Sequence, residues 1–203
     1  YRGAAPINRT IMNGEKQGGV TTFFLRHAID TGNIIYREKI AIAEDTSAGE
    51  YHDKLMKLGA KLVIRTVEAI KTGSVTTSEQ SEFIAPGELL KTAPKISKED
   101  CRIDWTLSAR EVYNHIRGLS PYPGAFTELE LPSGKSLYLK IFKSSIKNSG
   151  SGEKPGTILS DHKTFFDIQC ADACISILEL QQSGKRRMNV HDFLLGLNAS
   201  MLG

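Results

Sequence analysis

Cysteine is scarce in this sequence, and its number is odd. Three cysteines among 203 residues cannot form the disulfide framework of a small secreted domain, so the composition favours a reducing compartment, and we expect the protein in the cytoplasm. Cys170 and Cys174 are neighbours, but no histidine or second cysteine pair lies close enough in sequence to complete a tetrahedral zinc set. We therefore expect two thiols facing each other across a hairpin, and no metal site.

The sequence also lacks a long apolar run. No stretch approaches the roughly 20 residues that cross a bilayer, so we expect no membrane segment. Hydrophobic residues make up 40% of the chain and charged residues 24%, which is typical of a globular protein. The length suits one large domain or two small ones.

The net charge is small, but it is unevenly divided along the chain. Residues 1–90 carry 11 basic and 11 acidic side chains, whereas residues 91–203 carry 15 and 12, so the whole formal excess of +3 lies in the second part. A solvated face and a surface that binds a polyanion explain such an excess about equally well. The excess is concentrated, with few acids between, in Lys135, Lys140, Lys143, Lys147, Lys154, Lys163, Lys185, Arg186 and Arg187.

The first part of the chain carries both helix and strand signals. Pro6 suits the first turn of a short helix that ends at Asn13-Gly14. Runs of β-branched and aromatic residues predict strands over 20–25 and 34–42. A capping box of Ser47 and Glu50 predicts a long helix that ends at Thr72-Gly73. Its buried side is expected to contain Tyr51, Leu55, Leu58, Leu62 and Ile70.

A short polar turn, residues 28–32, separates the two predicted strands. It contains Asp30-Thr31-Gly32, and because aspartate and glycine are common turn formers, a plain turn is the simpler interpretation. The turn nevertheless follows a strand. In open doubly wound sheets, ligands bind at strand ends, so this position also suits a functional carboxylate.

The composition changes at residue 73, which predicts two domains. Residues 73–94 are rich in serine, threonine and glutamate and contain Pro86-Gly87, so we expect a linker between domains 1–72 and 95–203. A second capping box, Ser108 with Glu111, predicts a helix. Short strands follow, which together fit a small β-barrel of the oligonucleotide-binding (OB) kind. These strands are expected at 125–131, 136–142, 157–159, 164–169 and 174–181, with a closing helix at 189–197.

Motifs in both parts resemble the folate-dependent formyltransferases. In the first part, Arg2-Gly-Ala-Ala-Pro-Ile7 is followed by the Ile29-Asp-Thr-Gly32 turn. The motifs of the second part resemble, in order and spacing, the C-terminal domain of the methionyl-tRNA formyltransferases. They are Ile103-Asp-Trp105, Ile116-Arg-Gly-Leu119, Pro121-Tyr-Pro-Gly124, Pro155-Gly-Thr-Ile158, Gly184-Lys-Arg-Arg-Met188 and Asp192-Phe-Leu194.

This resemblance implies both an architecture and an activity. The expected fold is α/β plus β: the C-terminal part of a Rossmann-like formyltransferase domain, followed by a small OB-like β-barrel domain. The implied enzyme moves the formyl group of 10-formyltetrahydrofolate, its co-substrate, to the amino group of methionyl initiator tRNA, without a metal. The family's catalytic asparagine and histidine precede the segment that Arg2 begins. We therefore expect a fragment that is inactive by itself.

The resemblance also supplies candidate site residues. An amine that attacks a formyl carbon loses a proton while the carbonyl oxygen gains charge, so the site needs a proton acceptor and a hydrogen-bond donor. Asp30 is the catalytic candidate, since a carboxylate can orient an imidazole and hold a water. Arg2, Gly3, Thr31 and Gly32 are predicted to bind substrate. The residues predicted to contact tRNA phosphates are Lys140, Lys143, Lys185, Arg186 and Arg187.

Two alternatives remain open at this point. The hydrolase domain of 10-formyltetrahydrofolate dehydrogenase shares the aspartate turn but uses water as the formyl acceptor. A chain without the catalytic asparagine and histidine could also be an RNA-binding fragment with no activity. The basic run at residues 185–187 favours the tRNA enzyme.

Overall fold

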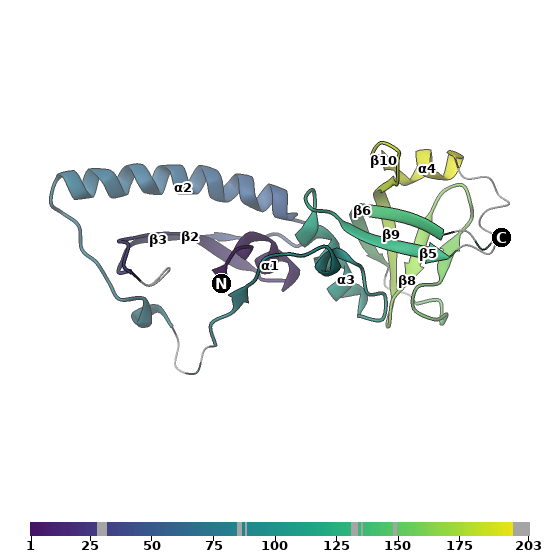
Figure 1. Ribbon diagram of the computed structural model, residues 1–203, viewed down its shortest axis with the longest axis horizontal. Helices are drawn as coiled ribbons and strands as arrows, with labels where there is room; N and C mark the ends of the chain where they lie inside the picture. The colour runs from purple at the N-terminus through teal and green to yellow at the C-terminus, as the bar shows by residue number, and fades with distance from the viewer. Residues whose placement is uncertain are drawn as a thin grey trace. The chain divides into compact units, whose positions relative to one another are not determined.

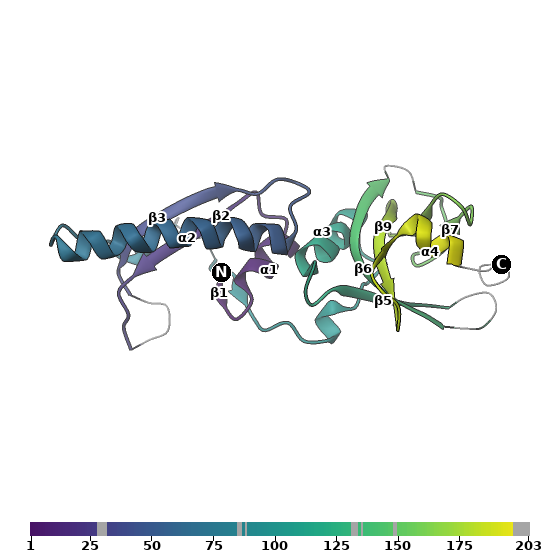
Figure 2. The same cartoon turned by 90° about the horizontal axis from the view of Figure 1, so that it is seen from above.

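The computed structural model describes residues 1–27, 32–84, 87, 89–130, 134, 136–147 and 150–196. The chain divides into two compact units. Unit 1 contains residues 1–10 and 15–95, and unit 2 contains residues 11–14 and 96–203. Figures 1 and 2 show the helices and strands of both units from two directions.

A β-hairpin and a long helix dominate unit 1. The helix α2 runs along the hairpin of β2 and β3 in both views (Figures 1 and 2). The elements in chain order are β1 (Arg2–Gly3), α1 (Pro6–Met12), β2 (Gln17–Phe23), β3 (Ile34–Ala41), α2 (Ala48–Lys71), the 3-10 helix η1 (Gln80–Phe83) and β4 (Thr92–Ala93). The two strands and two helices predicted in this part are therefore present, within a few residues of the expected bounds.

The pairing of β2 with β3 differs from that of a doubly wound sheet. The two strands are antiparallel, with Gln17 opposite Ala41 and Phe23 opposite Ile34. A parallel pair needs a crossover of about a dozen residues or more, and the connection of residues 24–33 is too short for one. Among the strands of the described residues, the one parallel pair is β1 with β4, and an isolated parallel bridge joins Arg102 to Phe126. The predicted turn therefore lies at the end of an antiparallel hairpin.

The helix α2 begins and ends where its sequence predicts. The Ser47 hydroxyl accepts a hydrogen bond from the Glu50 amide, and the Glu50 carboxylate accepts one from the Ser47 amide, so the capping box is confirmed. Gly73 follows the helix with a φ of 67°, a conformation that glycine adopts without strain. Tyr51 and Leu62 are buried as expected.

The predicted buried side of α2 is wrong at Ile70, which is 48% exposed. Thr66 and Ala69 are buried instead. The Thr66 hydroxyl lies 2.9 Å from the hydroxyl of Thr22 on β2 and donates to the Leu62 carbonyl. A pattern of apolar residues cannot identify a threonine whose hydroxyl is satisfied in this way. The opposite side of α2 consequently exposes Met56, Val63, Ile64, Val67 and Ile70.

Unit 2 is a curved antiparallel sheet with helices packed on it. Its strands follow the order β5-β6-β9-β8-β7, and β10 pairs with β9. The elements are the 3-10 helix η2 (Glu99–Cys101), α3 (Ala109–Leu119), β5 (Ala125–Glu130), β6 (Ser136–Lys147), β7 (Ile158–Ser160), β8 (Phe166–Gln169), β9 (Cys174–Gln182), β10 (Met188–Asn189) and α4 (Val190–Gly196). All five predicted strands and both predicted helices are present.

The core of unit 2 lies between the sheet and the helix α3. Val112, Ile116 and Leu119 of α3 are at most 1% exposed, as the helical spacing predicts, and they belong to one apolar cluster with the inward residues of β5, β6, β8 and β9. The buried Trp105 indole donates to the Thr127 hydroxyl at 2.9 Å. This bond satisfies the indole N–H, whose burial without a partner would destabilise the folded state.

Cys170 and Cys174 are buried free thiols on either side of a tight turn. The Cys170 amide donates to the Ala173 carbonyl at 2.8 Å, and the Cys174 thiol donates to the Gln169 side-chain oxygen at 3.2 Å. Burial raises the pKa of Cys170 to about 12, so this thiol is protonated at neutral pH.

Among the described residues, no helix has the length and apolar character needed to span a membrane.

Candidate functional site

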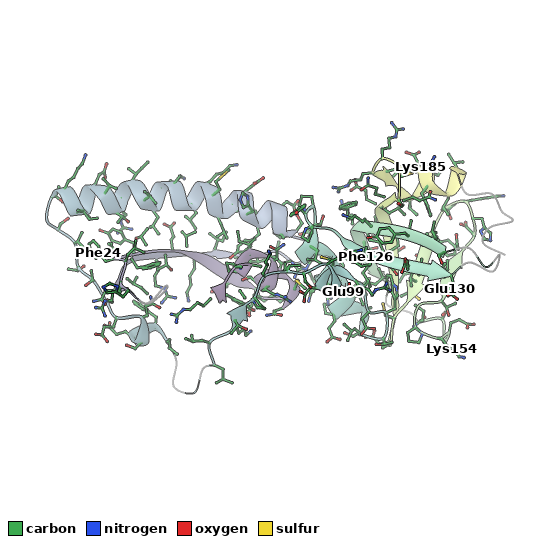
Figure 3. All side chains as sticks on the ribbon, in the orientation of Figure 1. Phe24, Glu99, Phe126, Glu130, Lys154 and Lys185 are labelled. Carbon is green, nitrogen blue, oxygen red and sulfur yellow. The ribbon has the colours of Figure 1, made fainter. Side chains whose placement is uncertain are left out.

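The predicted catalytic Asp30, together with Thr31, lies outside the described residues. The two arms that lead into and out of residues 28–31 are described. The incoming arm contains Phe24, which follows β2 (Figure 3), and Arg26. The outgoing arm contains Gly32 and Asn33, and their contacts define the base of the turn.

The two arms are bonded to each other. The Phe24 amide donates to the Asn33 carbonyl at 3.1 Å, and the Arg26 guanidinium donates to the Asn33 side-chain oxygen at 2.8 Å. A Cβ atom at Gly32 would lie 1.4 Å from the Phe24 carbonyl oxygen. Because the obstacle is backbone, only glycine fits at this crossing. Gly32 therefore has a steric role, whatever its contact with substrate.

A third segment of unit 1 joins this base. The Gln80 side-chain amide donates to the Gly32 carbonyl at 2.9 Å, and its oxygen accepts a hydrogen bond from the Arg2 guanidinium at 3.1 Å. Two backbone hydrogen bonds between Ile34 and Ser78, at 2.8 and 3.0 Å, fix the same segment beside β3. Arg2 and Gly32, predicted separately as substrate-binding residues, are thus connected through one glutamine.

Gly3 allows the backbone of Arg2 to lie close to β4. A Cβ atom at Gly3 would lie 2.2 Å from the Ala93 carbonyl oxygen, and its φ is 140°. The Arg2 amide donates to the Lys91 carbonyl at 3.1 Å. The backbone on both sides of the Arg2 side chain is therefore fixed by the parallel pair of β1 and β4.

Residues 73–94, which were expected to form a linker, contribute directly to this region. Ser78, Gln80 and the strand β4 all belong to unit 1. A single glutamine in a polar stretch has no periodicity or motif that would mark it, and a two-residue strand such as β4 is too short for a pattern of alternation. These contacts therefore cannot be predicted from a local sequence pattern.

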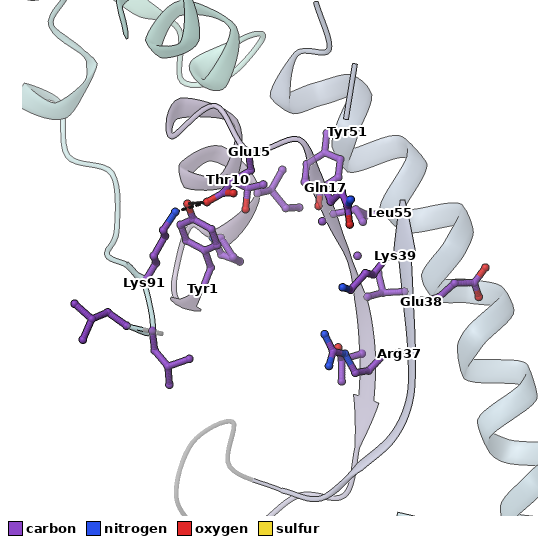
Figure 4. Close-up of a pocket in the computed structure, with 18 of the residues that line it drawn as sticks. Tyr1, Thr10, Glu15, Gln17, Arg37, Glu38, Lys39, Tyr51, Leu55 and Lys91 are labelled. Carbon is purple, nitrogen blue, oxygen red and sulfur yellow. Dashed lines mark hydrogen bonds and ion pairs between the residues drawn. The ribbon is translucent and has the colours of Figure 1, made fainter. Parts of the chain in front are cut away.

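An open cavity of about 990 Å³ lies elsewhere in unit 1. Figure 4 shows Arg37 and Lys39 of β3 along it and Tyr1, Glu15 and Lys91 at one end. The Lys91 ammonium and the Tyr1 hydroxyl both donate to the Glu15 carboxylate, at 2.5 and 2.7 Å. The bond from Lys91 is the main cause that lowers the pKa of Glu15. Of the predicted site residues that the structure describes, none lines this cavity, so we assign it no chemistry.

The predicted tRNA-binding residues lie on two neighbouring parts of unit 2. Lys140 and Lys143 belong to β6, and Lys185 and Arg186 lie in the turn between β9 and β10, where Figure 3 labels Lys185. The Lys140 ammonium donates to the Pro123 carbonyl at 3.1 Å. Lys143, Lys185 and Arg186 are exposed.

The expectation that acids are sparse around these cations is wrong at Arg187. Its guanidinium donates two hydrogen bonds to the Glu179 carboxylate, at 2.5 and 2.7 Å, and lies 4.3 Å from the centre of the Phe142 ring. Lys143 is opposite Glu179 on the adjacent strand. The bonds from Arg187 hold the pKa of Glu179 below its usual range. In sequence Glu179 is eight residues away, but the turn into β10 folds the chain back and brings the two charges together.

Two sequence families match the chain. The formyl transferase family matches residues 1–67, and the family of formyl transferase C-terminal domains matches residues 95–198. In the described part of the chain, histidine, cysteine, aspartate and glutamate side chains do not gather in groups of three or more that could hold a metal ion.

Curated relatives match almost the whole chain. The methionyl-tRNA formyltransferase of Azobacteroides pseudotrichonymphae is 50% identical over 203 residues, which are 100% of this chain and 62% of that protein. The methionyl-tRNA formyltransferase of Phocaeicola vulgatus is 47% identical over 200 residues, 98% of this chain and 62% of that protein. The chain thus spans 62% of the length of each of these relatives.

Solved structures share the fold at low sequence identity. HypX from Aquifex aeolicus has a TM-score of 0.68 and 20% identity, and the match covers 97% of this chain and 34% of that one. WlaRD, a sugar 3N-formyl transferase, has a TM-score of 0.61 and 22% identity, covering 92% of this chain and 62% of that one. With both parts of the sequence matched and relatives up to 50% identical along their shared length, the chain belongs to the formyl transferase family.

Proposed function

We propose that this chain is the larger part of a methionyl-tRNA formyltransferase, which transfers the formyl group of 10-formyltetrahydrofolate to the amino group of methionyl initiator tRNA. The observation that carries the proposal is the identity of 42–50% with proteins of that name over nearly the whole chain. Solved structures of the same fold contain tetrahydrofolic acid or 5-N-formyl-THF, which supports a reduced folate as the formyl donor.

In this proposal Asp30 assists proton transfer at the formyl carbon. The attacking amine must lose a proton while the formyl oxygen gains negative charge, and a carboxylate that orients a histidine or a water favours both changes. Bonds from Phe24 and Arg26 to Asn33 join the two segments that flank residues 28–31 in the sequence. Such bonds restrict the position of a catalytic group, which is a large part of what an active site contributes.

The proposal also assigns the parts of the chain and its location. Residues 1–72 would be the C-terminal portion of the catalytic domain, residues 73–94 the connection, and residues 95–203 an OB-like barrel that helps to hold the tRNA. Initiator tRNA, a molecule of the translation apparatus, and reduced folate, a one-carbon carrier, are both soluble, so the protein would act in the cytoplasm.

An assay of formyl transfer tests the proposed function. A protein extended to the length of its relatives is expected to form formyl-methionyl-tRNA from 10-formyltetrahydrofolate and charged initiator tRNA, whereas residues 1–203 alone are expected to form none above an enzyme-free control. Release of formate that proceeds equally well without tRNA would instead support the hydrolase alternative. Binding of tRNA without either reaction would support the RNA-binding alternative.

The charges of unit 2 predict how tRNA affinity depends on salt. Three phosphate contacts from Lys143, Lys185 and Arg186 give a slope of about −2 to −3 in a plot of log affinity against log salt, with a dissociation constant of about 10⁻⁴ to 10⁻⁶ M. Arg186→Gln should flatten the slope by nearly one unit. Arg187→Gln should change it much less, because Glu179 already offsets the charge of Arg187. Salt titrations with initiator and elongator tRNA measure both effects.

The matched variant for this experiment is Glu179→Gln. It releases Arg187 from its carboxylate, so the slope should become steeper by about one unit and the affinity should rise. Melting curves of all three variants control for folding. Affinity that does not depend on salt, or equal effects of the two arginine substitutions, would contradict the assignment of Arg186 as a phosphate contact.

A further inference from the structure

Gln80 connects two segments that are far apart in the sequence. Its oxygen accepts a hydrogen bond from Arg2, 78 residues away, and its amide group donates to the Gly32 carbonyl, 48 residues away. Both distances, 3.1 and 2.9 Å, are those of good hydrogen bonds. Gln80 itself is half-buried in η1, beside the backbone bonds that join Ser78 to Ile34.

The primary amide suits these two partners. A guanidinium only donates hydrogen bonds and a backbone carbonyl only accepts them, so a residue that joins the two must accept on one side and donate on the other. Glutamine does both without carrying charge. A carboxylate at position 80 would still accept from Arg2 but would repel the Gly32 carbonyl, and an apolar side chain would do neither.

Both partners of Gln80 are predicted to bind substrate in the proposed reaction. Gly32 directly follows the Asp30-Thr31 step and crosses the Phe24 carbonyl so closely that no side chain fits there. Arg2 is an exposed cation on a backbone fixed to β4. A long arginine side chain samples many rotamers unless a bond restricts it. The bond to Gln80 restricts its guanidinium to the side chain that also bonds Gly32.

We propose that Gln80 is a positioning residue for formyl transfer, which holds the Arg2 guanidinium and the backbone of Gly32, two residues after Asp30 in the sequence, in one fixed arrangement. The inference rests on the proposed function. Gln80 acts through two partners that are predicted to bind substrate, so its loss should lower kcat, because the arrangement of the reacting groups becomes less well defined, and should raise KM by a smaller factor.

Two substitutions in the protein extended to the length of its relatives test this role. Gln80→Met keeps the length of the side chain and removes both hydrogen bonds, and we expect kcat to fall about tenfold while KM rises by no more than about threefold. Gln17→Met is the matched control. Gln17 is an exposed glutamine of β2 in the same unit, with no side-chain hydrogen bond among the described residues, so this variant should retain full activity.

Gln80→Glu adds a readout that a purely structural role would not produce. Above the pKa of the new carboxyl group the variant lacks the donor to Gly32, and below it the protonated acid can donate as the amide does. Because an ordinary glutamate has a pKa of about 4.3 and the Arg2 guanidinium favours its charged form, the ratio of the variant's kcat to that of the parent should stay low from about pH 8 to about 6 and rise only as the pH approaches about 4.5. The corresponding ratio for Gln80→Met should stay flat over this range.

A double-mutant cycle with Arg2→Ala tests whether the bridge acts as a unit. If Gln80 and Arg2 act through the same contact, the double variant Arg2→Ala with Gln80→Met should lose less than the product of the two single losses. A parent that forms no formyl-methionyl-tRNA overturns the proposed function. An active parent whose Gln80→Met variant has normal kcat, or whose loss is explained by a lower fraction of folded protein, overturns only the role of Gln80.

Discussion

Replacing Asp30 with asparagine is expected to lower kcat for formyl transfer by about 100-fold or more in a protein extended to the length of its relatives. Asparagine has nearly the same shape but carries no charge, so it cannot favour a protonated imidazole or accept a proton, and contributions from general acid–base catalysis are of this size. The KM for charged tRNA should change little. Initial rates over a range of tRNA and folate concentrations give both constants.

A melting curve decides how the Asp30 result is interpreted. Asparagine is nearly isosteric with aspartate, so the melting temperature of the variant should stay within a few degrees of the parent value. Near-normal turnover, or a loss of activity that follows the fraction of unfolded protein, would show that Asp30 is not catalytic. The residue lies outside the part of the chain that the structure describes, so its catalytic role rests on the family resemblance and on its place in the sequence between β2 and β3.

Replacing Gly32 with alanine should have the second largest effect. The new Cβ atom would lie 1.4 Å from the Phe24 carbonyl oxygen, so one arm of the turn must move. Forcing extra atoms into a packed site costs about 1–3 kcal/mol of the free energy of unfolding. Displacing the Gly32 carbonyl should also break its bond with Gln80. We therefore expect the Gly32→Ala variant to lose formyl transfer even under conditions in which it remains folded.

Gly59→Ala is the control, and we expect it to change the free energy of unfolding in the opposite direction. Gly59 lies within α2, and a Cβ atom there would meet only a methyl group of Val20 at 3.9 Å, an ordinary contact. Alanine in a helix interior is favoured over glycine by about 0.5–1 kcal/mol, so this variant should be more stable than the parent. Urea unfolding of both variants measures the difference. An equal free energy of unfolding for Gly32→Ala and Gly59→Ala would contradict the close crossing at Gly32.

The elements that could be predicted from the sequence are those whose cause is local. A serine with an acid three residues later predicts both Ser47–Glu50 and Ser108–Glu111, and both capping boxes are present. The strands of unit 2 follow from β-branched residues between polar turns. Val112 and its partners on α3 are buried because helical spacing alone determines which side faces the sheet.

The features that escaped prediction depend on segments that meet only after folding. The ion pair of Arg187 with Glu179 requires β10 to fold back on β9, and the bridge through Gln80 requires three separate segments to converge. Burial of Thr66 instead of Ile70 depends on a hydroxyl partner on β2. No spacing rule within one segment contains this information. The predicted substrate and tRNA contacts remain predictions for the same reason.

The outward side of α2 has a practical consequence for work with this chain. Met56, Val63, Val67 and Ile70 follow one another at intervals of seven, four and three residues, so they form a single apolar line, and each is more than 40% exposed. Exposed apolar patches favour association between molecules. Self-association through this line would then limit the protein concentration at which the chain stays monomeric, so binding and unfolding are best measured on dilute samples.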